Sequence, residues 1–180
     1  MHEIVLPETK PALEWINDRA LQKVSPRREH ALAQLRFATA LDAWAANRGA
    51  GNVGTEWHFQ VRPPGEIGRT LVPDVAYLSF ERMSFEKQER TGIPHLAPDV
   101  VVEIRSPADL QVDIDEKVRV YLAAGTNVVV LVDPDQRSVI AVDRRATRVM
   151  SENDVIAHEM LPEFRLAARR LFETTRPKHR

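Results

Sequence analysis

The run Val100-Val101-Val102-Glu103-Ile104 constrains the fold of this chain more than any other segment. A dense series of β-branched residues is typical of a strand that is covered on both faces. Glu103 interrupts the series, and a carboxylate in such a strand loses hydration that only a partner can replace. We therefore expect Glu103 to be protonated, ion-paired or metal-bound. The residues alone leave two interpretations open: a metal ligand, or a carboxylate at the end of the strand that is paired with Arg105 or Lys117.

The segments around this strand predict an α/β fold. Apolar residues at helical spacing indicate a long helix, with Ser25 as its N-cap, Pro26 at its first position and a buried stripe of Ala31, Leu35, Ala38, Leu41 and Ala45. The other predicted elements are an N-terminal hairpin 13–24, the long helix 27–47, strands 53–61 and 70–79, an exposed loop or short helix 80–98, a helix 112–124, a strand 128–132, a hairpin 138–143 with 146–150, and a short helix 166–173.

The order of these elements predicts how they pack. A central mixed β-sheet flanked by helices is the simplest arrangement, with the two long helices on opposite faces. The strand–helix–strand unit 100–132 should form a right-handed crossover between parallel strands. The length of 180 residues fits a single domain, 1–180, that ends in a basic tail, 174–180.

The composition and the N-terminal residues exclude several classes of protein. The absence of cysteine excludes disulfides and zinc-thiolate sites. The first residues lack the basic and apolar regions of a signal peptide, and the longest apolar run is too short to cross a bilayer. We therefore expect a soluble cytoplasmic protein without a membrane partner. The net charge of −1 argues against a surface that is basic throughout, although it permits a local basic groove.

A second carboxylate, Asp74, follows Pro73 at the start of a predicted strand. Taken alone it is a turn residue, but beside Glu103 on an adjacent strand it would complete a paired-carboxylate site. Two converging carboxylates repel each other, and a hard cation such as Mg²⁺ or Mn²⁺ relieves that repulsion through oxygen ligands. Lys117 lies at the edge of a helical apolar stripe, where a surface lysine is equally expected. Glu29, in the first turn of the long helix, could simply complement the helix dipole.

These residues together resemble a known family. The elements of the resemblance are Glu29-His30, Pro73-Asp74, the segment Pro98 to Pro107, Lys117 and Tyr121 before Gly125, Val132-Asp133-Pro134 and the segment Leu161 to Leu166. In order and spacing they are similar to the Uma-type predicted restriction endonucleases of the PD-(D/E)XK nuclease superfamily. The resemblance extends from about residue 13 to about residue 172 and implies a restriction-endonuclease-like fold.

The resemblance also implies roles for individual residues. Asp74 resembles the first acid of the motif and Glu103 the second, and both would hold the metal. Arg105 stands where the superfamily has its motif lysine, and Lys117 is similar to a lysine that has moved to the following helix. Glu29 resembles a helix carboxylate that assists the metal site.

The implied function is Mg²⁺- or Mn²⁺-dependent endonucleolytic cleavage of DNA, with a homodimer as the expected assembly. Lys117 would act on the attacking water and the transition state, and Arg105 would contact a phosphate. Two other readings stay open. The replacement by Arg105 favours a nuclease fold that binds nucleic acid or protein without catalysis, and a large separation of Glu103 from Asp74 would favour an unrelated α/β protein with a buried ion pair.

Overall fold

A computed structural model describes residues 3–23 and 26–174, and its centre is a six-stranded sheet. The strands lie in the order β11-β10-β9-β8-β7-β4. The pair β8 and β9 is parallel, as predicted, and the other neighbouring pairs are antiparallel. The bounds of these strands are β4 Gly51–Thr55, β7 Val75–Ser79, β8 Val100–Ile104, β9 Val128–Asp133, β10 Ser138–Val142 and β11 Thr147–Ser151.

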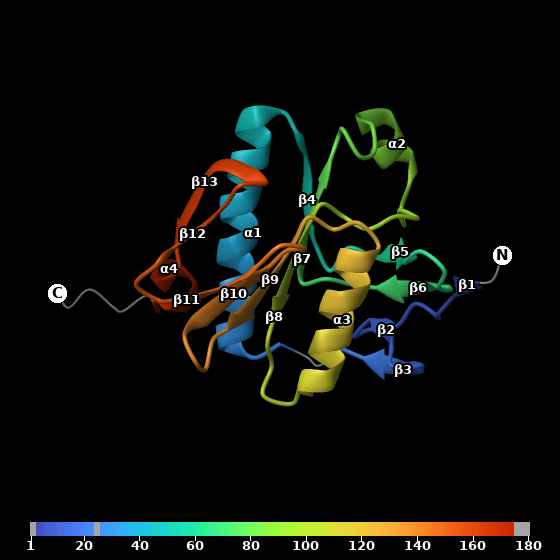
Figure 1. Cartoon of the computed structure of the whole chain (residues 1–180), viewed down its shortest axis with the longest axis horizontal. Helices are drawn as coiled ribbons and strands as arrows, with labels where there is room; N and C mark the ends of the chain where they lie inside the picture. The colour runs from blue at the N-terminus through green and yellow to red at the C-terminus, as the bar shows by residue number, and fades with distance from the viewer. Residues whose placement is uncertain (1–2, 24–25, 175–180) are drawn as a thin grey trace.

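The two long helices cover opposite faces of this sheet, which confirms the predicted α/β architecture (Figure 1). Helix α1 (Arg28–Arg48) packs against a core that includes Val100 and Val102, whereas α3 (Gln111–Ala123) packs against a second core that includes Val101. Side chains alternate between the faces along a strand. Glu103 therefore shares the α3 face with Val101.

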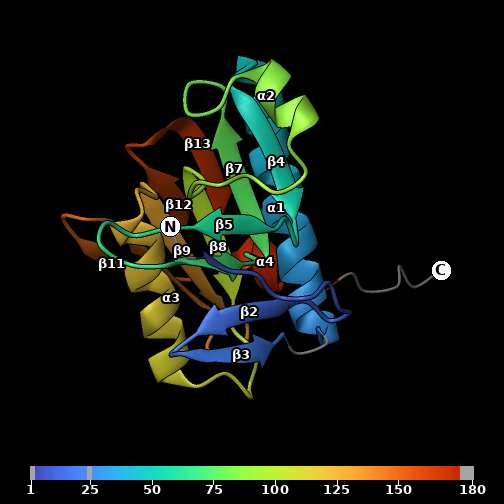
Figure 2. The same ribbon diagram turned by 90° about the vertical axis from the view of Figure 1, so that its right-hand side faces the viewer.

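Smaller elements extend both layers (Figure 2). On the α3 side, apolar residues of the hairpin β2–β3 and of a three-stranded sheet, β1-β6-β5, join the α3 core. On the α1 side, a second hairpin and a short helix complete the other core. The bounds of these elements are β1 Glu3–Ile4, β2 Leu13–Ile16, β3 Arg19–Gln22, β5 Phe59–Val61, β6 Gly68–Leu71, α2 Phe85–Arg90, β12 Val155–His158, β13 Leu161–Ala167 and α4 Arg169–Phe172.

The prediction of one continuous strand at 53–61 and another at 70–79 is wrong, because each segment forms two shorter strands. The first divides into β4 and β5 at Glu56, whose φ of 50° leaves the extended region. The second divides into β6 and β7 around Pro73, which has no N–H to donate to a ladder. In both cases the two pieces belong to different sheets, so the breaks send the chain from one sheet to the other.

Helix α1 begins at Arg28, later than predicted, and buries a different stripe. Arg27 is its N-cap, so Pro26 precedes the helix, and Ser25 lies outside the described residues. Leu41 and Ala45 are buried as predicted, but Leu35 is 62% exposed. The buried positions are His30, Ala33, Phe37, Leu41 and Ala45.

The C-terminal part contains a hairpin that the sequence did not predict. Strands β12 and β13 pair, and β13 takes up residues that were assigned to the helix 166–173, which is therefore reduced to α4. Residues 175–180 of the predicted basic tail, and Val24 of the first hairpin, lie outside the described part of the chain. The hairpin 138–143 with 146–150, the helix 112–124 and the strand 128–132 are confirmed with small shifts at their ends.

Gly51 provides a test of how closely β4 packs on β7. A Cβ atom at this position would lie 2.3 Å from the carbonyl oxygen of Leu78 and 2.7 Å from the ring of Tyr77. We expect Gly51→Ala to lower the free energy of unfolding by about 1–3 kcal/mol, because the backbones of β4 and β7 must move apart to make room for the methyl group. The control is Gly92→Ala, where a Cβ meets nothing within 4 Å, and urea denaturation should show no loss of stability there. Equal stability of the two variants would contradict the close approach.

Candidate active site

Asp74 and Glu103 lie on neighbouring strands, as predicted. Asp74 directly precedes β7, and the pairing of Val75 with Val102 brings it beside Glu103 on the antiparallel neighbour β8. The Asp74 carboxylate accepts a hydrogen bond of 2.6 Å from the Ile104 N–H through Oδ2. Both carboxylates line one cavity of about 250 Å³. The separation that would have indicated an unrelated protein is therefore not observed.

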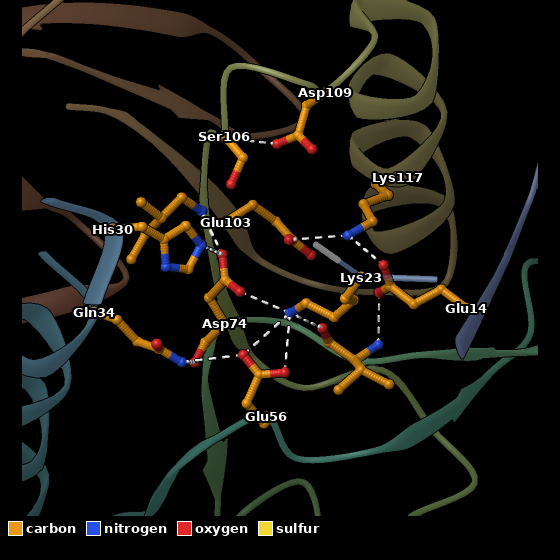
Figure 3. A network of polar contacts seen from close by, with 12 residues as sticks. Glu14, Lys23, His30, Gln34, Glu56, Asp74, Glu103, Ser106, Asp109 and Lys117 are labelled. Carbon is orange, nitrogen blue, oxygen red and sulfur yellow. Dashed lines mark hydrogen bonds and ion pairs between the residues drawn. The ribbon is translucent and has the colours of Figure 1, made fainter. Parts of the chain in front are cut away.

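Lys117 reaches this cavity from α3 and contacts two carboxylates (Figure 3). Its Nζ lies 3.0 Å from Oε2 of Glu103 and 2.6 Å from Oε2 of Glu14. Glu14 is 1% exposed, and its other oxygen, Oε1, accepts a 2.8 Å hydrogen bond from the Val72 N–H. Lys117 is thus held between a carboxylate of the central sheet and one of the hairpin β2–β3.

A second lysine, Lys23, neutralises Asp74. Its Nζ lies 2.6 Å from Oδ1 of Asp74 and 3.2 Å from Glu56, and it donates a 2.8 Å hydrogen bond to the Val72 carbonyl oxygen. On the other side of Asp74, Nε2 of His30 lies 3.3 Å from Oδ2. Both oxygens of Asp74 therefore have cationic or N–H partners, as Figure 3 shows.

The surroundings shift the pKa values of these groups in opposite directions. Burial, with the nearby charges of Glu14 and Asp74, raises the pKa of Glu103 to about 8, although Lys117 opposes the shift. Burial would also raise the pKa of Asp74, but Lys23 and His30 outweigh it and hold that pKa below its ordinary value. The pKa of Lys117 is raised despite its burial, because Glu103 and Glu14 favour the ammonium form. Lys117 is therefore a cation at neutral pH.

Some buried polar atoms at the site lack a hydrogen-bond partner among the described residues. They include Oε1 of Glu103 and Nδ1 of His30. An unsatisfied carboxylate oxygen is unfavourable in a folded interior, since it has lost water and gained nothing. Glu103 thus has an acceptor oxygen available for a further positive or proton-donating group.

Two other residues that were singled out from sequence occupy the edge or the outside of this site. Arg105 lines the cavity with its side chain 40% exposed, and its guanidinium lies 3.9 Å from Asp133. Glu29 does not line the cavity: its side chain is 48% exposed and pairs with Arg28. The neighbouring residue, His30, faces Asp74 instead.

Sequence reasoning missed Glu14 and Lys23. Glu14 left only a weak signal, because it lies on the same side of β2 as Ile16, which is buried. Lys23 left none: its partner Asp74 is 51 residues away in the chain, and only the tertiary fold joins them.

Comparisons with known proteins show the family and the fold to which this chain is similar. The profile of the Uma2 family, described as "Putative restriction endonuclease", matches residues 3–169. The chain belongs to the Uma2 family. A solved crystal structure of "a putative nuclease belonging to DUF820" from Anabaena variabilis is similar to this Uma2 chain, with 26% sequence identity, 93% of each chain covered and a TM-score of 0.82. No curated protein matches the chain significantly.

The family and the similar structure confirm the predicted nuclease fold and support a nuclease function for this Uma2 protein. Within residues 3–23 and 26–174, no helix is both long and apolar enough to span a bilayer. In the same residues, no group of three or more His, Asp or Glu side chains converges as a ready-made metal site. Lysine ammonium groups stand against the carboxylates instead.

Lys23→Met should show how much the Lys23 ammonium group contributes to stability by neutralising Asp74. The variant leaves a buried carboxylate with an incomplete set of partners, so we expect a loss of about 3–5 kcal/mol in unfolding free energy at neutral pH. Because the pKa of Asp74 is lowered in the folded protein, its stabilising effect is present above its ordinary pKa and disappears as the pH falls through the folded value.

The difference in unfolding free energy between the native protein and Lys23→Met should therefore shrink in acid, below the ordinary carboxyl pKa of about 3.9. Urea denaturation over a pH series measures it. Arg28→Met, which breaks the exposed pair with Glu29, is the control and should change little. A difference that stays constant with pH would refute the coupling of Lys23 to Asp74.

Proposed function

We propose that the cavity of Asp74, Glu103 and Lys117 is the active site of a divalent-metal-dependent DNA endonuclease. The observation that carries the proposal is the pair of buried carboxylates, contributed by adjacent strands and accompanied by Lys117, in a chain of the Uma2 family. Burying two carboxylates and a lysine together is a poor way to stabilise a fold, since apolar residues of similar size often stabilise it more. A chemical role explains the arrangement better.

The residues fit Mg²⁺ or Mn²⁺ in chemistry and in charge. Carboxylate oxygens are the ligands that these hard cations prefer. The carboxylates of this network outnumber its lysines: Lys23 and Lys117 are the two lysines paired with Glu14, Glu56, Asp74 and Glu103. Glu103 also has an oxygen without a partner. Asp74 and Glu103 would hold the ion, once Lys23 has moved from Asp74 toward its other partner, Glu56.

The bound ion would polarise the scissile phosphate and lower the pKa of a water molecule. Lys117, as an ammonium, would stabilise the negative charge that develops on the phosphate. Its raised pKa makes it unsuited to remove a proton from water. Arg105 lies at the exposed edge of the same cavity, where its guanidinium would bind a neighbouring phosphate through paired hydrogen bonds.

Cleavage assays under single-turnover conditions with Mg²⁺ and Mn²⁺ test these roles. Asp74→Asn and Glu103→Gln should lose metal binding and cleavage together. Lys117→Met should lose cleavage by at least about 100-fold even at saturating metal and DNA, because it acts on the transition state. Arg105→Ala should weaken DNA binding and flatten its salt dependence, as a lost phosphate contact does.

Glu29→Gln is the matched control, because it alters a carboxylate that the resemblance implied but that lies outside the cavity. It should cleave at the native rate. A Lys117→Met protein that cleaves as fast as native would overturn the role of Lys117. Metal binding and cleavage both absent from the native protein would favour the non-catalytic binding module, for which Arg105 in place of the motif lysine is the supporting feature. The homodimer stays a prediction.

The expected pH dependence of metal binding follows from the raised pKa of Glu103. Its pKa of about 8 means that it is largely protonated at neutral pH, so a metal ion must displace this proton. Apparent affinity should therefore rise with pH, by up to tenfold per unit, and level off above pH of about 8. Calorimetry in buffers of different ionisation enthalpy should detect the released proton. A native protein that binds the metal with an affinity independent of pH would contradict the assignment.

A further inference from the structure

Glu103 begins a row of side chains that runs from the acidic pair across the sheet toward its edge. The ladders pair Glu103 with Leu131, Leu131 with Ile140, and Ile140 with Val149. All four side chains stand on the α3 face, because their neighbours Val130, Val139 and Ala141 belong to the core under α1. We call the three residues after Glu103 the apolar row. It extends from the carboxylates through partly buried Leu131 and Ile140 to Val149, which is 70% exposed.

The first two residues of the apolar row form part of the same cavity as the carboxylates. Leu131 and Ile140 line it from the sheet, and Leu110 and Ile114 line it from the start of α3, which covers this face. Leu110, the N-cap residue of α3, is 57% exposed, although it stands next to the site. The cavity of about 250 Å³ exceeds what a hydrated ion needs, since it corresponds to roughly eight water molecules at ~30 Å³ each.

An apolar wall beside a phosphodiester site has to be explained by the substrate. A DNA backbone offers charged phosphates, which Lys117, Arg105 and an ion held by the carboxylates would accommodate. The large apolar surface of a nucleotide is the face of its base. Neighbouring strands are ~4.8 Å apart, so Ile140 lies ~10 Å from Glu103, on the scale of one nucleotide. In an intact duplex the base faces are stacked and cannot reach such a wall.

We propose that Leu131, Ile140, Leu110 and Ile114 form a subsite for one unpaired nucleobase next to the cleaved phosphodiester bond. The substrate is therefore single-stranded DNA, or DNA with a base turned out of the helix. This inference rests on the proposed nuclease function and adds the form of the substrate to it. The base lies between the sheet and the start of α3, and aliphatic contacts of this kind accept any base, since every base has an apolar face.

Binding in Ca²⁺, measured by fluorescence anisotropy with labelled oligonucleotides, tests the subsite. The probes are a single strand, the same strand with one abasic nucleotide placed at each position in turn, a perfect duplex, and a duplex with a central mismatch. We expect the single strand and the mismatched duplex to bind at least ~10-fold more tightly than the perfect duplex. One abasic position should weaken single-strand binding by ~10-fold. A 2-aminopurine at that position should change its fluorescence on binding of the single strand. The same probe in the mismatched duplex identifies the source of the base: a change there as well shows an extruded base, whereas a change in the single strand alone shows that only a free strand supplies it.

Ile140→Thr keeps the β-branched shape and should weaken binding of the intact strand but not of the strand that is abasic at the sensitive position. Val142→Thr is the matched control, on the same strand and face but outside the cavity lining, and should bind as native. Equal binding of the perfect duplex and the single strand, with no sensitive abasic position, would overturn the subsite while leaving the nuclease proposal intact. Failure of every probe to bind would overturn the nuclease proposal and the subsite together.

Discussion

Neutralisation of buried carboxylates by lysines from other elements holds the two sides of the site together. Asp74 and Glu103 stand beside each other in the sheet, where each would raise the proton affinity of the other, so that ionisation of both together is unfavourable without a counter-charge. Lys23 and Lys117 supply the missing charge from the end of a hairpin and from α3. Glu14 then binds Lys117 on its far side, so that the hairpin, the helix and the sheet are joined by alternating charges. The hairpin β2–β3 is thus part of the site, although it lies outside the central sheet.

The parts of the fold that could be predicted from sequence are those in which local pattern and tertiary environment agree. The run 100–104 is apolar on both sides because helices cover both faces, and its bounds were predicted without error. Helix α3 combines an apolar stripe with a glycine stop, and it too was located to within one residue. Strands 53–61 and 70–79 were merged because residue type alone does not reveal that the chain changes sheets at Glu56 and Pro73.

The site was predictable to the extent that its residues stand out against their neighbours. Glu103 did so within an apolar run, and Asp74 followed from the resemblance. His30, and not the predicted Glu29, faces Asp74. The reason is geometric, since adjacent residues on a helix point about 100° apart. The observed stripe of Ala33, Phe37 and Leu41 continues back to His30, not to Glu29. Lys23 could not have been found, because nothing in its neighbourhood distinguishes it from a solvated lysine.

The pKa values suggest why a site of this kind can exist before a cation arrives. Full ionisation of the carboxylates, which outnumber the lysines paired with them, would crowd negative charges in a largely buried cluster. Protonation of Glu103, whose pKa of about 8 favours the neutral acid at neutral pH, removes one of these charges without any movement of the chain. Lys23 meanwhile holds Asp74 as a carboxylate, ready to accept a different partner. The proton and the lysine thus serve as exchangeable counter-charges. Under the proposed function, a divalent cation that replaced both would find Asp74 and Glu103 already side by side, and this preorganisation would offset the stability that a buried charge cluster gives up.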